Sequence, residues 1–475
     1  MNSPIARLYV VVLLLFAVLV GATSWNTVFR AEALQDNPKN RRELLEQQRI
    51  RRGVIRAADD SLLARSVHQP DDTYSRTYPD DELFAHAVGY SFTRFGRSGL
   101  EQSRNDALTG TGTELGSLFD RLSGIEPEGD DVRTTLDPGA QRAALQGLAG
   151  RKGAVVALDP QTGAVKAMAS TPGYDPNEVA DGRTFSRLNR DDDAPLLNRT
   201  TQSGYPPGST FKVVTAIAAM DSGRYEPDST VSGRNDKPIS GVPLQNFGGE
   251  DFGEITLTEA LTKSVNTAWA EVGEKLGAEV MERYMDRLGF GDAVRVDLPE
   301  SERRASGVFR GGRPIPVTSR FVDVGRMAIG QDLLNVTPLQ MAMVAAAVAN
   351  GGRLMQPHLT DRIVDRDGRT VDRIQPREMS RVMSESSANE VADMMANVVR
   401  EGSGTAAALE GIDVAGKTGT AEVDRPCGPN QVWFVAFAPR NDPKVAVAAT
   451  VECSEGTGGV IAAPIAKQVM QELLR

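Results

Sequence analysis

A serine and a lysine stand three residues apart at Ser209 and Lys212, a spacing that could support nucleophilic catalysis. On a helix this spacing places the hydroxyl and the amine on one face at neighbouring heights. Pro207 and Gly208 precede the serine and predict that it lies in the first helical turn, where free backbone N–H groups and the helix dipole favour a developing oxyanion. Apolar neighbours would lower the pKa of the lysine and let it act as a base. Taken alone, the pair is more typical of a capping serine beside a surface lysine.

Two later groups bear on the same chemistry. The run Ser264-Val265-Asn266 has the pattern S-x-N, which occurs at three other places in the chain and means little by itself. The run Lys417-Thr418-Gly419-Thr420 occurs once, after small and branched residues at 414–416 that predict a strand with little bulk. This segment is either an edge strand weakened by glycine or a strand along which a peptide substrate can lie.

The order and spacing of the three groups favour the chemical interpretation. S-x-x-K at Ser209, S-x-N at Ser264 and K-T-G at Lys417 together resemble the motifs of the penicillin-binding protein and serine β-lactamase superfamily. Val265 stands in the middle position of the second motif, where the superfamily pattern has aspartate, and the serine and asparagine of that motif remain in place. The resemblance therefore rests on the whole set of motifs.

The resemblance extends over most of the chain beyond the first residues. It is a resemblance to the class B, monofunctional penicillin-binding proteins, and among them to the actinobacterial penicillin-binding protein A type. One departure is Arg56-Ala57-Ala58-Asp59, which replaces the family's usual Asp-Arg-Asn-Gly turn and concerns only the local turn geometry. The similar segments are 52–55, Gly96 with 99–101, 135–137, 328–331 and 337–342.

The resemblance implies catalytic roles for three residues. Ser209 is expected to attack the carbonyl between two D-alanines, with Lys212 as the base that activates it. Ser264 is expected to relay the proton to the leaving amine. An amine on a neighbouring stem peptide then takes the acyl group from the enzyme. The implied function is that of a peptidoglycan D,D-transpeptidase that penicillin acylates and that β-lactams target.

Substrate contacts follow from the same resemblance. Asn266 would hydrogen-bond the peptide amide of the substrate, and Lys417 with the Thr418 hydroxyl would recognise its terminal carboxylate, beside Gly419. The backbone N–H groups of Ser209 and Thr420 would form the oxyanion hole, in which one donor contributes roughly 3 to 4 kcal/mol. The resemblance implies no cofactor.

Other functions remain open on the same fold. A D,D-carboxypeptidase transfers the acyl group to water, and the sequence does not choose between water and an amine. A serine β-lactamase needs rapid deacylation, and no Glu-x-x-Leu-Asn stretch follows Ser264. A β-lactam sensor would need a second membrane span and a signalling module, which the sequence does not show. A non-catalytic scaffold of the cell-wall machinery is disfavoured because Ser209, Lys212, Ser264 and Lys417 are all present.

The helices and strands must bring the motifs together. Two apolar runs around the turn at 159–163 predict a hairpin, and residues 432–438 and 444–451 predict a second one. Thr337-Pro338 and Asn350-Gly351-Gly352 predict the start and the end of a long apolar helix. We therefore expect an α+β fold whose transpeptidase domain has an antiparallel sheet flanked by helices, as in β-lactamases.

The length of 475 residues and a change of pattern near Lys152 indicate two folded units. Short apolar runs alternate with turn signals between residues 53 and 137, which predicts a small strand-rich domain. We expect a cytoplasmic tip and membrane anchor at 1–24, a non-catalytic pedestal or dimerisation-like domain at 25–149, and the penicillin-binding transpeptidase domain at 150–475.

Residues 8–23 form an apolar run between Arg7 and Trp25 that is typical of a membrane-targeting segment. At about 1.5 Å per residue the run is short for a hydrocarbon core of about 30 Å, so a spanning helix would require Arg7 to snorkel. A cleaved signal peptide is the alternative. Either way the remainder is exported, and we expect a single-pass protein of the cell membrane with its catalytic domain outside the cytoplasm.

The composition of the chain argues against some classes of partner. A net charge of −10 and the lack of a dense basic run argue against nucleic acid, and three histidines and two cysteines are too few for the common metal sites. The resemblance implies peptidoglycan stem peptides on lipid-linked or nascent glycan, β-lactams, the membrane and a SEDS-family polymerase with other cell-wall machinery as partners.

The two cysteines supply a further hypothesis. If residues 432–438 and 444–451 pair as a hairpin, antiparallel register brings Cys427 and Cys453 nearly opposite one another. An exported location permits a disulfide between them, which would stiffen the rim beside the strand at 417–420. Two free buried thiols are the alternative.

Overall fold

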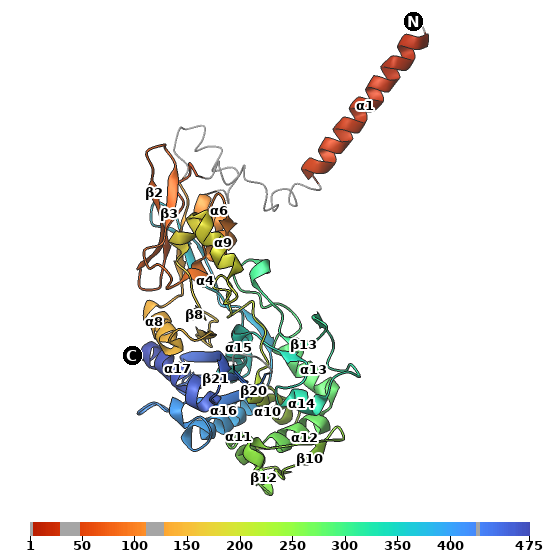
Figure 1. Cartoon of the computed structure of the whole chain (residues 1–475), viewed down its shortest axis with the longest axis vertical. Coiled ribbons are helices and arrows are strands. Elements are labelled where there is room, and N and C mark those ends of the chain that lie inside the picture. The colour runs from red at the N-terminus through yellow and green to blue at the C-terminus, as the bar shows by residue number, and fades with distance from the viewer. Residues whose placement is uncertain (1–2, 29–47, 111–127, 424–427) are drawn as a thin grey trace.

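The computed structural model describes residues 3–28, 48–110, 128–423 and 428–475. The first helix, α1 (Ser3–Val28), stands away from the folded body (Figure 1). Its span from Arg7 to Trp25 covers 19 residues with a mean hydropathy of 2.3, and none of it is buried. By length and composition α1 can therefore cross a membrane.

A six-stranded sheet forms the centre of the N-terminal part, in the order β18-β17-β6-β1-β2-β3. β1 lies parallel to β6 and antiparallel to β2, and β17 pairs antiparallel with β6. Two strands from much later in the chain thus complete this sheet, although they fall within the range 150–475. The strands are β1 (Ile55–Arg56), β2 (Leu62–His68), β3 (Tyr74–Thr77), β6 (Asp131–Thr134), β17 (Thr360–Val364) and β18 (Thr370–Arg373).

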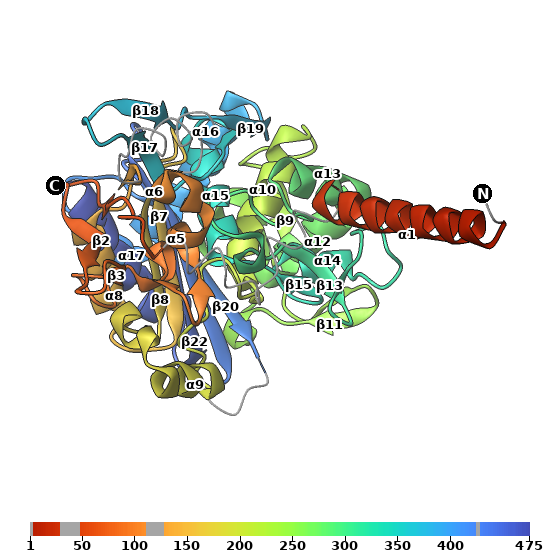
Figure 2. The same ribbon diagram turned by 90° about the horizontal axis from the view of Figure 1, so that it is seen from above.

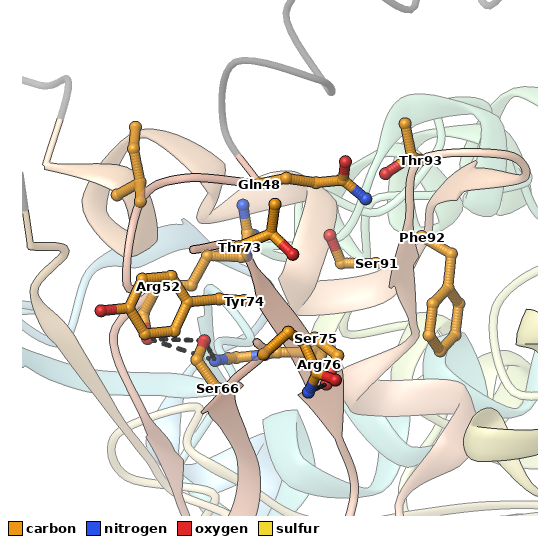
Figure 3. A pocket seen from close by; sticks show the side chains of 12 residues that line it. Gln48, Arg52, Ser66, Thr73, Tyr74, Ser75, Arg76, Ser91, Phe92 and Thr93 are labelled. Carbon is orange, nitrogen blue, oxygen red and sulfur yellow. Dashed lines mark hydrogen bonds between the residues drawn. The ribbon is translucent and has the colours of Figure 1, made fainter. Parts of the chain in front are cut away.

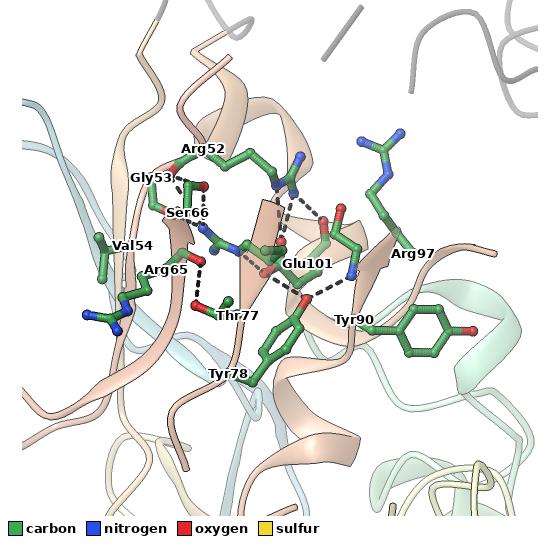
Figure 4. Close-up of polar contacts among 12 residues, drawn as sticks. Arg52, Gly53, Val54, Arg65, Ser66, Thr77, Tyr78, Tyr90, Arg97 and Glu101 are labelled. Atoms are coloured by element: carbon green, nitrogen blue, oxygen red, sulfur yellow. Dashed lines mark hydrogen bonds and ion pairs between the residues drawn. The ribbon is translucent and has the colours of Figure 1, made fainter. Parts of the chain in front are cut away.

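A buried cluster of charges lies between this sheet and helix α5 (Gly99–Ser103), as Figure 4 shows. The Glu101 carboxylate accepts from Arg52 Nη2 at 2.9 Å and from Arg76 Nε at 2.5 Å, and its side chain has no solvent exposure. Burial by itself would raise the pKa of Glu101, but the charges of Arg76 and Arg52 and their hydrogen bonds lower it below its ordinary value. The carboxylate therefore stays ionised and paired.

A pocket of about 150 Å³ lies beside this charge cluster, between β3 and the hairpin of β4 (Ser91–Phe92) and β5 (Gly96–Arg97) (Figure 3). Arg52 and Arg76 line it together with the hydroxyl-bearing residues Ser66 and Ser91. None of the residues of the three motifs lines this pocket.

Polar contacts fasten the N-terminal part to residues 297–302, in the part of the molecule that holds the three motifs. Arg104 Nη2 lies 3.0 Å from Asp297 Oδ2, and Gly99 N donates to Glu302 Oε1 at 2.9 Å. Burial raises the pKa of Glu302 to about 7. The neighbouring helices on the N-terminal side are α4 (Ala85–Val88), α5 and α6 (Asn105–Thr109).

The part of the molecule that holds the three motifs is built on a five-stranded antiparallel sheet in the order β20-β21-β22-β7-β8. Helices α8 (Pro138–Leu148) and α17 (Gly458–Leu473) cover one face, and α15 (Pro338–Ala349) with α10 (Lys212–Asp221) lies on the other (Figure 2). Both predicted hairpins are confirmed. The strands are β7 (Gly153–Leu158), β8 (Val165–Thr171), β20 (Ala415–Glu422), β21 (Asn430–Ala438) and β22 (Val445–Ser454).

The long apolar helix α15 forms where its capping residues predicted it. The Thr337 side chain accepts from Gln340 N, Pro338 occupies the first turn, and Asn350 follows the last helical residue. Every residue from Pro338 to Val348 is buried, because α15 lies between the sheet and the helices beyond it. The helix therefore shows no polar face, as a fully buried helix should.

The remaining elements complete the molecule. The helices are α9 (Gly182–Arg190), α11 (Leu257–Thr262), α12 (Asn266–Leu276), α13 (Ala278–Arg287), α14 (Val324–Ala328) and α16 (Glu385–Arg400), with short 3₁₀ turns η1 (Pro176–Ala180), η2 (Gly208–Phe211), η3 (Phe247–Gly249), η4 (Glu300–Glu302) and η5 (Thr405–Ala407). The small strands are β9 (Thr230–Ser232), β10 (Lys237–Ile239), β11 (Val242–Leu244), β12 (Glu254–Thr256), β13 (Gly307–Arg310), β14 (Arg313–Pro314), β15 (Leu334–Asn335), β16 (Arg353–Met355) and β19 (Glu378–Arg381).

Candidate active site

Ser209 lies in the first turn of a helical segment, as the sequence predicts. The turn η2 runs directly into α10, so Ser209 and Lys212 follow one another around the same axis. Gly208 has a φ of 52°, and a Cβ there would come within 2.8 Å of the Thr420 carbonyl carbon. Its N–H donates to Gly330 O at 3.0 Å. Only glycine fits this close approach, which sets Ser209 beside strand β20.

Lys212 is completely buried and points its amine at the second motif. The Nζ atom donates to Ser264 O at 2.7 Å and to Asn266 Oδ1 at 2.8 Å, and lies 3.4 Å from Ser264 Oγ. Asn266 Nδ2 in turn donates to Gln245 O at 3.1 Å, which turns the amide oxygen toward the lysine. The second motif is therefore tied to the first through the amine of Lys212.

The second motif occupies the tight connection between α11 and α12. A capping box formed by Thr256 and Glu259 starts α11, and Asn266 is the first residue of α12. Ser264 between them has a φ of 60°, an uncommon conformation for a serine. Backbone strain of this kind collects at functional sites, where the surrounding structure holds it in place.

Lys417 enters the same network from β20, the strand at one edge of the five-stranded sheet. Its Nζ donates to Ser264 Oγ at 2.8 Å and to Thr418 O at 3.0 Å, and its side chain is completely buried. The Ser264 hydroxyl thus lies between two lysine amines. A Cβ on Gly419 would meet Pro207 O at 2.7 Å, so the glycine lets η2 pack directly on the strand.

Both lysines are buried, and neither has a negative partner in the part of the chain that the structure describes. Burial lowers the pKa of Lys417 to about 7. Burial, and then the charge of Lys417, hold the pKa of Lys212 well below its usual range. Among the described residues, the hydrogen-bond acceptors of these two amines are backbone, hydroxyl and amide oxygens, with no carboxylate. Such amines can exist uncharged near neutral pH and are chemically reactive.

The structure also brings in residues that the sequence did not single out. Ser403 Oγ lies 2.6 Å from Thr418 Oγ1, and Gly458 N donates to Thr420 Oγ1 at 3.1 Å. A pocket of about 400 Å³ continues along β20 beyond Thr420, with Gln331 and Glu422 among its lining residues. The glycines on both sides of Ser403 are a signal of close packing, but glycines are frequent throughout this sequence.

All predicted residues of the three motifs therefore lie at one place: Ser209, Lys212, Ser264, Asn266, Lys417, Thr418, Gly419 and Thr420. The predicted disulfide between Cys427 and Cys453 can be followed at only one of its two cysteines. Cys453 is disulfide-bonded, whereas Cys427 lies outside the described residues, so the pairing stays a prediction. Strand β21 pairs Ala438 with Val445 and Val432 with Val451, and the register shifts by a bulge near Asn430.

Comparisons with known proteins agree with this geometry. The family model described as the penicillin binding protein transpeptidase domain matches residues 153–471, and that of the penicillin binding protein A dimerisation domain matches residues 52–132. The chain is 35% identical over 507 residues to the peptidoglycan D,D-transpeptidase PbpA of Mycolicibacterium smegmatis, covering 100% of this chain and 99% of that protein. It is 34% identical over 501 residues to PbpA of Mycobacterium tuberculosis.

Solved structures give the same result. The ceftriaxone acyl-enzyme complex of penicillin-binding protein A from M. tuberculosis superposes with a TM-score of 0.82 at 33% identity, covering 91% of this chain and 100% of that one. The penicillin G acyl-enzyme complex of the same protein gives a TM-score of 0.80. The motifs, the fold and these likenesses agree, and the chain belongs to the penicillin-binding protein transpeptidase family, in its class B, penicillin-binding protein A branch.

Proposed function

We propose that this protein is a peptidoglycan D,D-transpeptidase that joins stem peptides through an acyl-enzyme on Ser209. One observation carries the proposal: two buried lysines that have no counter-ion among the described residues meet at Ser264, and one of them, Lys212, follows Ser209 by one helical turn. The names of the relatives, and the β-lactam acyl-enzymes formed by the structural neighbours, support the same chemistry.

The hydrogen bonds of Lys212 suit it to act as the base. An uncharged amine has two N–H bonds and one lone pair. Ser264 O and Asn266 Oδ1 can only accept, and they lie at the two shortest distances from Nζ. When they take the two N–H bonds, the lone pair remains free for the proton of the Ser209 hydroxyl. The lowered pKa supplies the uncharged form.

Acylation then follows as a balanced exchange. Ser209 Oγ forms a bond to the carbonyl carbon between the two D-alanines while its proton passes to Lys212. The C–N bond breaks when the Ser264 hydroxyl gives its proton to the leaving amine, and Ser264 recovers a proton from Lys212, whose Nζ lies 3.4 Å from Ser264 Oγ. The terminal D-alanine leaves, and an ester on Ser209 remains.

The free edge of β20 provides the binding site for the peptide. Lys417 and the Thr418 hydroxyl would bind the terminal carboxylate, Asn266 the peptide amide, and the N–H groups of Ser209 and Thr420 the oxyanion. Residues that precede the D-alanines would then run toward the pocket beyond Thr420. An amine of a second stem peptide completes the reaction by attacking the ester.

The location and partners of the enzyme belong to the same proposal. α1 would anchor the chain in the cell membrane, with residues 1–24 as tip and anchor, 25–149 as the non-catalytic domain and 150–475 as the extracytoplasmic transpeptidase domain. Lipid-linked or nascent peptidoglycan would be its substrate. A SEDS-family polymerase in the same membrane would supply the glycan strands.

Intact mass spectrometry after incubation with penicillin tests the nucleophile. The wild-type protein should gain the mass of one penicillin, and Ser209→Ala should gain none. Ser186→Ala, at an exposed position of α9, should gain the same adduct as the wild type. An adduct on Ser209→Ala would overturn the assignment.

A second measurement tests the acceptor. The protein is mixed with a peptide ending in D-alanyl-D-alanine and with an amine-bearing stem peptide, and the products are separated by mass. A joined peptide supports a transpeptidase. Release of D-alanine with only the shortened peptide as the second product would instead assign a D,D-carboxypeptidase.

A further inference from the structure

The Ser403 hydroxyl lies next to the third motif, in the short connection between α16 and η5. Ser403 Oγ and Thr418 Oγ1 are 2.6 Å apart, a distance typical of a strong hydroxyl pair. Thr418 is only 7% exposed, whereas Ser403 is exposed. The pair therefore lies where the buried network around Lys417 reaches the surface.

The backbone around Ser403 is held on two sides. Ser403 N donates to Thr262 O at 3.4 Å, and Gly404 N donates to Val398 O at 3.0 Å. A Cβ on Gly459, in the first turn of α17, would meet Ser403 O at 2.3 Å. This packing against α11 and α17 fixes the serine backbone relative to Thr418.

A hydroxyl has a single hydrogen, so its orientation decides what it can bind. If Thr418 gives its hydrogen to Ser403, it has none for a carboxylate. If Ser403 gives its hydrogen to Thr418 Oγ1, the Thr418 hydrogen is free to point toward a carboxylate, and the hydrogen-bond chain strengthens that donor. The second arrangement is the one that a bound carboxylate selects.

We propose that Ser403 is a positioning residue that orients the Thr418 hydroxyl toward the terminal carboxylate of the substrate. The inference rests on the proposed function, because it assumes that Thr418 binds this carboxylate. Lys417 supports the need for such a donor. Two of the three N–H bonds of its charged amine go to Ser264 Oγ at 2.8 Å and to Thr418 O at 3.0 Å, and Nζ also lies 3.4 Å from Thr418 Oγ1, so the amine has little donor capacity left and hydroxyls share in binding the anion.

The test compares two ligands that differ only in the carboxylate. Acylation rate constants are measured with penicillin and with its methyl ester, for the wild type and for Ser403→Ala. We expect Ser403→Ala to slow acylation by penicillin about three- to tenfold, the effect of one neutral hydrogen bond, and to leave acylation by the ester unchanged. Ser403→Thr, which keeps a hydroxyl, should restore the penicillin rate.

A double variant separates positioning from a general structural role. In a Thr418→Val background the carboxylate has lost its hydroxyl donor, so adding Ser403→Ala should have no further effect on the penicillin rate. Ser186→Ala serves as the control that changes neither rate. If Ser403→Ala slows both ligands equally, or if the two effects multiply in the double variant, the proposal is wrong.

These outcomes are distinct from a failure of the proposed function. If the wild-type protein forms no Ser209 adduct with penicillin, the transpeptidase assignment fails and Ser403 has no carboxylate to serve. If the wild type is acylated and Ser403→Ala retains the full penicillin rate, only the positioning role fails.

Discussion

Two groups of buried basic side chains can be compared in the described part of this molecule, and they differ in whether the positive groups have a negative partner. In the N-terminal part, Arg52 and Arg76 enclose the Glu101 carboxylate, and positive and negative groups meet directly. In the catalytic part, Lys212 and Lys417 approach one serine hydroxyl and share no carboxylate among their described contacts. Burial is complete or nearly complete in both places.

The difference shows how burial produces either stability or reactivity. A buried charge with a counter-ion keeps its charge, and the pKa of Glu101 lies below its ordinary value. A buried amine without a counter-ion gives up its proton more easily, and the pKa of Lys417 lies at about 7. The first arrangement joins elements of a fold, and the second prepares groups for proton transfer.

The largest effect on acylation is expected when Lys212 is replaced by a residue that stays charged. Lys212→Arg places a group there that does not lose its proton, so the base is lost while the charge stays. We expect the acylation rate constant with penicillin to fall by about 10²- to 10⁴-fold, the range of general base catalysis. Lys263→Arg, at an exposed position next to Ser264, should keep the wild-type rate. Equal loss in both variants would contradict the special role of Lys212.

Changes in the cluster of Arg52, Arg76 and Glu101 should instead alter the free energy of unfolding. Glu101→Gln leaves two buried arginines without a negative partner and should destabilise the N-terminal part by about 3 to 5 kcal/mol, measured from its unfolding transition in urea. Glu128→Gln breaks the exposed pair with Arg51 and should cost less than about 1 kcal/mol. Acylation per folded molecule should be unchanged in both. A catalytic loss at full stability would mean that the cluster has a chemical role.

Glu302 provides an intermediate case, a partly buried carboxyl that forms no salt bridge with a described residue. Its pKa is raised to about 7, so the carboxyl stabilises the fold below about pH 4.5, and this stability is lost as the pH rises toward 7. Glu302→Gln keeps an acceptor for Gly99 N and does not ionise. We expect the variant to be more stable than the wild type above pH 7, by at most roughly 3 kcal/mol, and to lose this advantage near pH 4.

Thermal unfolding of the two proteins across this pH range checks the prediction for Glu302. A stability difference that stays constant with pH would show that the Glu302 carboxyl does not titrate between 4.5 and 7.

The last expected effect concerns the pH profile of acylation. The rate should rise with pH as Lys212 loses its proton, with a midpoint well below that of an ordinary lysine. It should then fall about tenfold per pH unit above about 7, where Lys417 loses the charge that attracts the carboxylate. The methyl ester of penicillin should show the rise without the fall. A fall with both ligands would mean that Lys417 acts in proton transfer and not in carboxylate binding.

The site was more predictable than the sheet that surrounds it. Ser209, Lys212, Ser264 and Lys417 could be found because local spacing and residue type identify them, and the caps of α15 follow from Thr337 and Pro338 in the same way. The addition of β17 and β18 to the N-terminal sheet could not be predicted, because that pairing depends on strands far apart in sequence.

Contacts between side chains that are far apart in the sequence could not be predicted either. Glu101 belongs to a recognised segment, but its two arginine partners come from different strands and loops, and no local pattern joins them. Ser403 is a single serine among many, and only the packing of α11, α17 and β20 places it at the carboxylate end of the site. Residues that act through a neighbour need three-dimensional information to be found.

The entry of β17 and β18 into the first sheet has a consequence for how this architecture can be divided. A protein cut before residue 150 would still carry these two strands, and their hydrogen-bonding edge, which β6 now covers, would be left bare. Such a truncated chain should associate with itself unless that edge is shielded. The two halves are accordingly not interchangeable modules, and any foreign N-terminal half grafted onto this enzyme would need a vacant strand position to receive β17.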